Sequence, residues 1–244
     1  MAPGSLAKGE DKDMKYDVIL SIIFYICGCF YMIYSATVVA THAKSKILWL
    51  YVTLVSVLAI WAFSYSISNS VSTAEVSALW RSFSALGWGT FSSLLLHLIL
   101  VLTKIESRIK KRSMLIMLYL PAVINVVLFG PYGCLAEKHY QMVQTDLGWV
   151  NMPPMYAARI WLNAYYVVFS VISILLLVYW WRKIESYTPE KREARNFIVA
   201  TVFFFSMAAV IDTLPDILGK KSFPPLGIVL LIVPIIMLFA VLRK

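Results

Sequence analysis

Charged residues are scarce in this 244-residue sequence, and their scarcity decides the class of protein. Only 14% of the residues are charged, 60% are hydrophobic, and the mean hydropathy is +0.76. An average soluble domain carries about 25% charged residues. The composition therefore excludes an ordinary soluble domain and indicates an integral membrane protein.

The sequence also lacks the motifs of soluble catalysis and of cofactor binding. It contains no P-loop and no G-x-G-x-x-G, H-E-x-x-H or G-x-S-x-G pattern. Its few cysteines and histidines have spacings that fit neither a zinc site nor a disulfide framework. They are Cys27, Cys29, Cys134, His42, His97 and His139. We therefore expect no catalytic residue, no metal site and no cofactor.

Seven continuous apolar runs are present instead, each about as long as the 20 residues that a membrane-spanning helix needs. They lie at about 18–40, 47–67, 78–103, 114–130, 158–181, 196–214 and 226–242. The runs are too long and too continuous for the strands of a membrane barrel, so we predict an all-α, polytopic seven-transmembrane helix bundle over residues 14–244. Residues 1–13 form a polar stub that we suspect is foreign to the native protein, because Met14 could itself be a translation start.

Lysine and arginine are concentrated in alternate connections between these runs. They gather near residues 44–46, 104–112, 182–195 and 243–244, which lie on one side of the membrane in a seven-helix topology. Cytoplasmic loops carry such an excess, so we predict that the N-terminus is outside and the C-terminus is cytoplasmic. The net charge of +9 then favours contact with anionic membrane lipids and gives no argument for nucleic acid.

Three segments carry a resemblance to a known family. They are "WRSFSALGWGTFSSLLLHLILVLTK" (80–104), "YGCLAEKHYQMVQTDLGWVNMPP" (132–154) and "IDTLPDILGKKSFPPLGIVLLIVPIIM" (211–237). Together they resemble the N-terminal seven-transmembrane sensor region of bacterial histidine kinases, a module also found on diguanylate cyclases. The resemblance implies a multi-pass receptor of the bacterial inner membrane, acting in signal transduction and two-component systems.

The resemblance also implies a cytoplasmic output domain in cis, beyond the seventh helix. The sequence ends at Lys244 without a phospho-acceptor helix or an ATP-binding domain, so we expect a sensor module and no enzyme in these residues. Histidine kinases of this kind would need a homodimer for phosphotransfer between subunits. No G-x-x-x-G seam is present, so the bundle alone is expected to dimerise weakly at most.

Two other seven-helix classes compete with a receptor. A microbial rhodopsin needs a lysine in its last helix for the retinal Schiff base, and the run "GIVLLIVPIIMLFAVL" contains none, which excludes it. A small-molecule transporter would show paired interruptions in corresponding helices of two repeats. The two halves of the sequence show no internal repeat, but a transporter remains the alternative function.

Polar side chains recur with helical spacing in the outer half of the predicted bundle. They are Arg159, Asn163, Tyr166, Ser170 and Ser173 in the fifth run, Arg81, Ser84, Trp88 and Ser92 in the third, Thr201 and Asp212 in the sixth, which share a face with Phe205 and Ala208, and Asn125 in the fourth. A polar stripe in a membrane helix should face the bundle interior or a wet cavity, and the alternative for each residue is an inter-helix hydrogen bond.

From this pattern we predict a pocket for an unidentified small-molecule or lipid ligand. Its ligand-binding residues are expected to be Arg81, Trp88, Asn163, Tyr166 and Asp212. Asp212 falls in the last turns of its helix, where the helix dipole disfavours a carboxylate, so we expect it to pair with Arg81.

Two further residues are singled out along the signalling path. His97 lies in an apolar stretch near the inner end of the third run, and we expect an inter-helix tie there, with a proton sensor as the alternative. Pro234 removes one backbone hydrogen bond about halfway along the seventh run and is predicted to be a signalling hinge.

Overall fold

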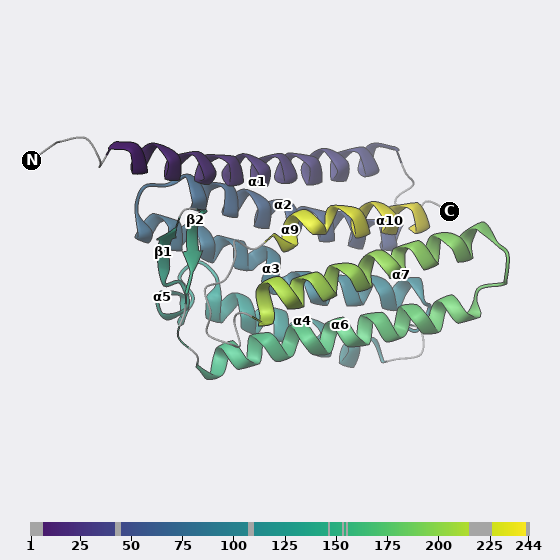
Figure 1. Cartoon of the computed structure of the whole chain (residues 1–244). Helices are drawn as coiled ribbons and strands as arrows, with labels where there is room; N and C mark the ends of the chain where they lie inside the picture. The colour runs from purple at the N-terminus through teal and green to yellow at the C-terminus, as the bar shows by residue number, and fades with distance from the viewer. Residues whose placement is uncertain are drawn as a thin grey trace, which may run out of the picture.

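The computed structural model describes residues 7–41, 45–106, 110–145, 147–152, 154, 156–214 and 226–242, and helices dominate them (Figure 1). The elements in chain order are α1 (Ala7–Thr41), α2 (Lys46–Ser70), α3 (Ala74–Leu102), α4 (Lys111–Phe129), α5 (Ala136–His139), β1 (Met142–Thr145), β2 (Gly148–Asn151), α6 (Ala157–Lys183), α7 (Pro189–Ala208), a π-helical turn (Ala209–Thr213), α9 (Gly227–Leu230) and α10 (Ile232–Leu242).

Three of the long helices, α2, α3 and α7, begin at side chains that accept a hydrogen bond from one of their first backbone amides. The Ser45 hydroxyl accepts from the Leu48 amide at 3.3 Å, and the Thr73 hydroxyl accepts from the Val76 amide at 3.4 Å. Thr188 caps α7 in the same way, with a proline at the first helical position. These caps determine the residue at which each of the three helices begins.

Six helical segments are long and apolar enough to cross a membrane. They are Val18–Thr41, Lys46–Ser70, Ala74–Leu102, Lys111–Phe129, Ala157–Lys183 and Pro189–Ile211. They match the first six predicted runs, so the protein is a helical, multi-pass membrane bundle. Many large apolar side chains on their outer faces are exposed, as lipid contact requires. They include Ile22, Ile26, Ile33, Met117, Leu120, Val123, Val127, Ile160, Val168, Leu175, Val199 and Phe203.

The predicted seventh run differs from the other six. It forms a shorter apolar helical segment, Gly227–Leu242, that is interrupted at Leu231 between α9 and α10. Pro234 has no amide hydrogen, so the carbonyl of Leu230 loses the partner that a continuous helix would give it. The interruption therefore falls one turn before the proline and not at the proline itself.

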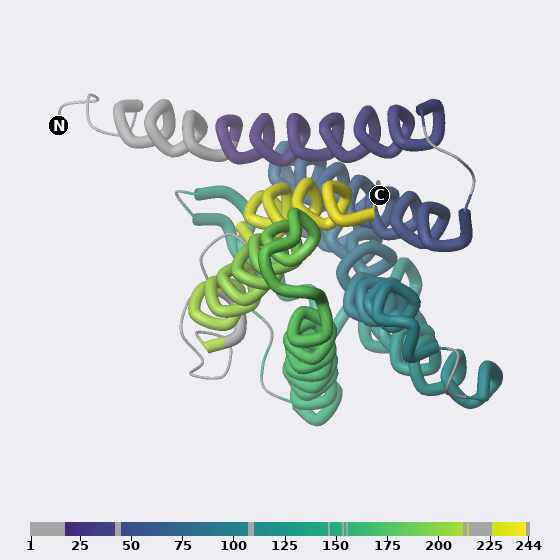
Figure 2. The backbone as a smooth tube through the Cα atoms, turned by 90° about the vertical axis from the view of Figure 1, so that its right-hand side faces the viewer, coloured from purple at the N-terminus to yellow at the C-terminus, as the bar shows by residue number. Residues whose placement is uncertain are grey.

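The third helix, α3, occupies the centre of the bundle (Figure 2). In its most apolar window 78% of the residues are buried, against 22% in each of α6 and α7. It packs against α2, α4 and α6, and α1 and α10 cover α2. Residues from α1, α2, α3, α6, α7, α9 and α10 form the main core.

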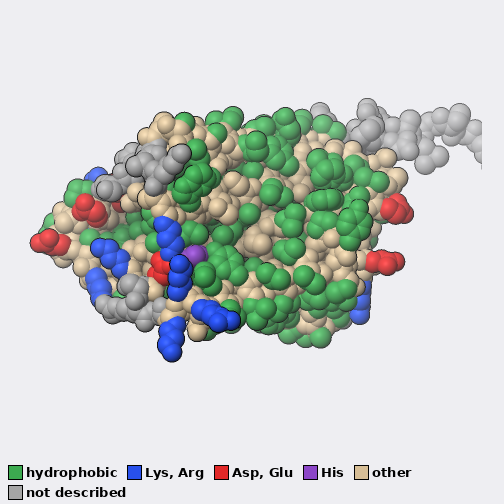
Figure 3. Space-filling view, turned by 180° about the vertical axis from the view of Figure 1, so that it is seen from behind, with side chains coloured by type: hydrophobic (Ala, Val, Ile, Leu, Met, Phe, Trp, Pro, Cys, Tyr) green, Lys and Arg blue, Asp and Glu red, His purple; other side chains and the backbone are tan. Residues whose placement is uncertain are grey.

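The chain alternates between two ends of this bundle (Figure 1). The "hairpin end" carries the α2–α3 connection and an antiparallel hairpin that pairs β1 with β2, in the register Val143 with Val150. The opposite "basic end" carries the α1–α2, α3–α4 and α6–α7 connections. Exposed lysine and arginine side chains gather at the basic end, and apolar side chains cover most of the face between the ends (Figure 3).

The hairpin was not anticipated by the prediction of an all-α bundle. Its tight turn depends on Gly148, whose φ of 98° is disfavoured for other residues, and on the Thr145 hydroxyl, which accepts from the Leu147 amide at 3.3 Å. Trp149 in β2 fastens it to the bundle by donating from Nε1 to the Val71 carbonyl at 2.8 Å. The hairpin thus covers the ends of α2 and α3.

Gly87 allows α2 and α3 to approach each other closely. A methyl group added at Gly87 would lie 2.5 Å from the Trp61 Cβ and 2.6 Å from the Val57 carbonyl oxygen, which are closer than van der Waals contact allows. At Gly89, two residues along the same helix, the nearest atom would be the Asn125 Cβ at 3.3 Å. The two glycines therefore have different structural demands.

We expect Gly87→Ala to destabilise the bundle by about 1–3 kcal/mol, because the added methyl forces α2 away from α3. Gly89→Ala is the matched control and should cost clearly less. Thermal unfolding of both variants in lipid nanodiscs, followed by tryptophan fluorescence, measures the difference. Equal melting temperatures for the two variants would contradict the close approach at Gly87.

Candidate functional site

A cavity of about 470 Å³ lies between α3, α6 and α7. Residues of α2 form its back wall, α5 and β2 contribute at the hairpin end, and the π-helical turn and α9 reach its margin. Its volume falls within the range of about 300–1,000 Å³ that is typical of small-molecule pockets. The cavity is the candidate ligand site of the bundle.

Four of the five residues that the sequence predicts for a ligand pocket line this one cavity. Arg81 and Trp88 reach it from α3, and Asn163 and Tyr166 reach it from α6. The fifth, Asp212, belongs to the π-helical turn, but its side chain lies outside the described residues. The predicted pair between Arg81 and Asp212 therefore stays a prediction.

Arg81 is 3% exposed and is held by neighbours from two elements, α2 and β2. Its Nε donates to the Ser68 hydroxyl at 3.0 Å, and its Nη2 donates to the Asn69 side-chain oxygen at 3.2 Å and to the Trp149 carbonyl at 2.8 Å. The guanidinium carbon also lies 4.0 Å from the centroid of the Tyr65 ring. These contacts fix a permanent positive charge at the wall of the cavity.

Trp88 and Tyr166 are joined across α3 and α6. The Tyr166 hydroxyl donates to the Trp88 carbonyl at 3.0 Å, and the Trp88 Nε1 donates to the Ser84 hydroxyl at 3.1 Å. The Trp88 ring centroid lies 6.4 Å from that of Tyr166. The polar atoms of both rings are thereby satisfied, which leaves their apolar faces to form the wall.

The polar stripe predicted in the fifth run is largely turned toward the cavity. Arg159, Asn163, Tyr166 and Ser170 line it, whereas Ser173 is buried elsewhere in the bundle. Asn125 in α4 takes the alternative role of an inter-helix contact: its side chain donates to the Gly89 carbonyl at 3.4 Å and accepts from Trp161 Nε1 at 3.0 Å.

Several lining residues were not predicted. Trp61 and Tyr65 lie one helical turn apart in α2, whereas His139, Tyr140, Val150 and Asn151 lie in the connection between α4 and α6, which helical periodicity cannot reach. His139 is 7% exposed, and its Nδ1 is 2.7 Å from the Tyr156 hydroxyl. Burial, and secondarily the charge of Arg159, lowers the pKa of His139 to about 3, so this ring is neutral at physiological pH.

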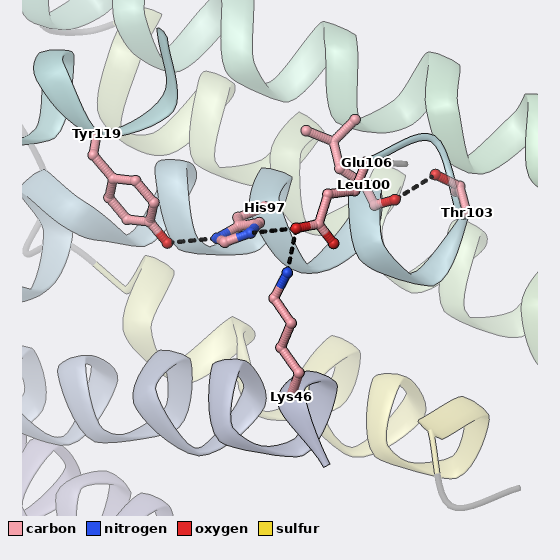
Figure 4. A network of polar contacts seen from close by, with 6 residues as sticks. All are labelled: Lys46, His97, Leu100, Thr103, Glu106 and Tyr119. Carbon is pink, nitrogen blue, oxygen red and sulfur yellow. Dashed lines mark hydrogen bonds and ion pairs between the residues drawn. The ribbon is translucent and has the colours of Figure 1, made fainter. Parts of the chain in front are cut away.

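His97 does not line the cavity and belongs to a polar network toward the basic end (Figure 4). Its Nδ1 is 2.7 Å from the Tyr119 hydroxyl of α4, which links α3 to α4. Its Nε2 faces Glu106, 3.9 Å from Oε1, and Lys46 at the start of α2 also binds that carboxylate. An Nε2–H that faces the carboxylate, with Nδ1 accepting from Tyr119, is the tautomer that suits both neighbours.

Glu106 was not predicted as a site residue, because it follows α3 in a connection that has no helical pattern. The hydrogen bond from Lys46, together with the nearby positive charges, holds the pKa of its carboxyl below the usual range. Glu106 therefore carries its negative charge at physiological pH and joins the ends of α2 and α3. His97 connects this ion pair to α4.

Pro234 lies in the first turn of α10, away from the cavity. The interruption beside it is tied to other helices by two tyrosines: Tyr31 donates to the Ile228 carbonyl at 2.7 Å, and Tyr51 donates to the Ile235 carbonyl at 3.0 Å. A bending point here would act against α1 and α2. Its role as a signalling hinge stays a prediction.

Comparisons of the chain with known protein families, with curated proteins and with solved structures found no match.

Acidification should destabilise the hairpin end through His139. The folded protein holds the pKa of His139 near 3 and the unfolded chain returns it to about 6.5, so stability is fully present above pH 6.5 and is lost as the pH falls toward 3. Between pH 6.5 and pH 5 the loss is up to about 2 kcal/mol. Thermal unfolding of the wild type across this range measures it.

His139→Phe should flatten this pH dependence, because the titrating ring is gone. Tyr156→Phe is the control, since it removes the hydroxyl partner but keeps the histidine and its titration. A slope in His139→Phe as steep as in the wild type would show that other groups cause the acid sensitivity.

Proposed function

We propose that this protein is the sensory receptor module of a signal-transduction protein. It binds an extracellular or membrane-borne small molecule in the cavity and relays a helix rearrangement to the basic end. The observation that carries the proposal is the course of α3. This central helix contributes Arg81 and Trp88 to the cavity and His97 to the network at the opposite end.

The relay has a physical basis in the packing of α3. Ser92 lines the cavity, and His97 follows it by about 8 Å of helix rise. A ligand that moves α3 against α2 or α4 must change the contacts among His97, Tyr119, Glu106 and Lys46, because those residues come from all three helices and their connections. A ligand shifts such an equilibrium only through different affinities for the two arrangements.

The orientation and the seventh span belong to this proposal. The exposed basic side chains at the basic end support a cytoplasmic location for it. They include Lys46, Lys104, Lys110, Lys111, Arg112, Arg182, Lys183, Arg192 and Arg195. With the hairpin end outside and α9–α10 counted as the seventh crossing, α10 leads toward a cytoplasmic output domain. The resemblance to histidine kinase and diguanylate cyclase sensor regions supports that domain, a homodimer in the full-length protein and a location in the bacterial inner membrane.

A transporter is the second candidate, and one observation favours it. The π-helical turn after α7 and the start of α9 both border the cavity, and transporters place broken helices at their substrate sites. Counterflow of a radiolabelled carboxylic acid into proteoliposomes would support transport, whereas binding without flux supports a receptor.

The orientation can be tested with the exposed native cysteine at the hairpin end. Cys134 should react with a membrane-impermeant maleimide in intact cells, because the proposal puts it outside. In a Cys134→Ser background, Tyr187→Cys in the α6–α7 connection should react only after the cells are lysed. If Tyr187→Cys reacts in intact cells and the wild-type Cys134 reacts only after lysis, the orientation is the reverse of the proposed one.

The relay can be tested by filling the cavity. In a variant whose three cysteines are replaced by serine, spin labels at Lys110→Cys and Tyr187→Cys report the distance between two connections of the basic end. Ser170→Trp fills the cavity from α6 and should shift that distance distribution, because the helices must separate around the new ring.

Val168→Trp is the matched control for this experiment. Val168 also belongs to α6, but it is 50% exposed on the outer face and does not line the cavity. Its replacement should leave the spin-label distances unchanged. A distance distribution that is the same in Ser170→Trp, Val168→Trp and the parent protein would contradict the relay.

A further inference from the structure

The cavity is polar at one end and apolar at the other. At the hairpin end its walls carry Arg81, Asn151 and Arg159, and deeper in the bundle they carry Phe91, Ile174 and Phe204. Along α6 the wall extends from Arg159 to Ile174, which is about 22 Å of helix rise. A molecule that matches this gradient has a polar head and an elongated apolar body.

Two cationic side chains lie at the polar end of the cavity. Among the lining side chains that the structure describes, Arg81 and Arg159 are charged and none is acidic. Both arginines are at most 5% exposed, so water screens their charge weakly. An anionic head group is therefore favoured over a neutral or cationic one.

The walls also contain buried polar atoms that lack a hydrogen-bond partner in the described structure. They include Trp61 Nε1 and Asn151 Oδ1. The indole can only donate, and the Asn151 amide offers a donor once it is rotated. A ligand with acceptor oxygens would satisfy both groups, and buried donors without partners are costly.

The side of the cavity joins the lipid-facing surface between α6 and α7. Val167 and Val171 line the cavity and are also 53% and 49% exposed. Ser206 and Ala209 form the facing edge and are exposed as well. A ligand dissolved in the bilayer would therefore reach the cavity between these two helices, with its apolar body already at the correct depth.

We infer that the cavity binds a membrane-borne amphipathic carboxylate of the long-chain fatty acid class. Its head lies at Arg159 and Arg81, at the hairpin end, and its chain lies between α6 and α7. We infer a carboxylate head group because guanidinium groups bind carboxylates through paired, charge-assisted hydrogen bonds. The inference rests on the proposed function, since it names the ligand class of that receptor.

The test uses the full chain in phosphatidylcholine nanodiscs and dibromostearate as the probe. Bromine quenches the fluorescence of nearby tryptophans, and Trp61 and Trp88 line the cavity. We expect saturable quenching by dibromostearate at a lower mole fraction than by the corresponding dibromostearyl alcohol. Equal binding of acid and alcohol, or quenching that only rises in proportion to the probe in the lipid, would overturn the inference.

Arg159→Gln should raise the Kd of dibromostearate by about tenfold or more and leave the alcohol nearly unchanged, because only the acid uses the charge. Lys138→Gln in α5 is the matched control: Lys138 is also cationic and lies at the hairpin end, but it does not line the cavity. An unchanged Kd in Arg159→Gln would overturn the placement of the head group.

A second pair of variants tests the chain site and does not depend on the arginines. Ile174→Phe narrows the apolar end and should weaken binding of the acid, whereas Leu175→Phe, at a neighbouring position that is 63% exposed, should not. Equal effects of the two variants would overturn the placement of the chain. If dibromostearate fails to bind but Ser170→Trp still shifts the spin-label distances, the receptor stands with a different ligand. If both fail, the proposed function fails too.

Discussion

Lipid offers no hydrogen bonds, so a polar group inside this bundle depends on the protein, or on a bound ligand, for its partner. That constraint explains why α3 is central. Its serines, Arg81 and His97 are buried, and each of its neighbours supplies acceptors or donors: Ser68 and Asn69 from α2, Tyr165 from α6. A polar helix could not take a place at the edge, and the apolar faces of α4, α6 and α7 are suited to the lipid-facing positions.

The same constraint gives the hairpin a structural role. The Trp149 carbonyl accepts from the Arg81 side chain, and the Trp149 indole donates to the Val71 carbonyl. The hairpin therefore supplies hydrogen-bond partners to a side chain of α3 and to the carbonyl at the end of α2. Burial of a guanidinium is costly without such partners. The connection that carries the hairpin is therefore part of the core at this end and positions one wall of the cavity.

The sequence predicts the site where helical periodicity applies and misses it where the chain leaves the helices. Arg81, Trp88, Asn163 and Tyr166 could be grouped because spacings of three, four and seven residues put them on inner faces at one level. His139, Asn151 and Glu106 reach their sites through connections whose path no periodicity encodes. The helix around Pro234 is interrupted, but one turn before the proline, because the lost hydrogen bond belongs to the carbonyl of Leu230.

The exposure of Val167 and Val171 at the margin of the cavity has a thermodynamic consequence. For any ligand that passes these side chains, the reservoir is the hydrocarbon phase and not the surrounding water. The apparent aqueous affinity is then the product of a partition coefficient and the intrinsic affinity within the bilayer. Occupancy follows the mole fraction of ligand in the membrane, so diluting the ligand with additional lipid would empty the cavity even at a constant total concentration of ligand and protein.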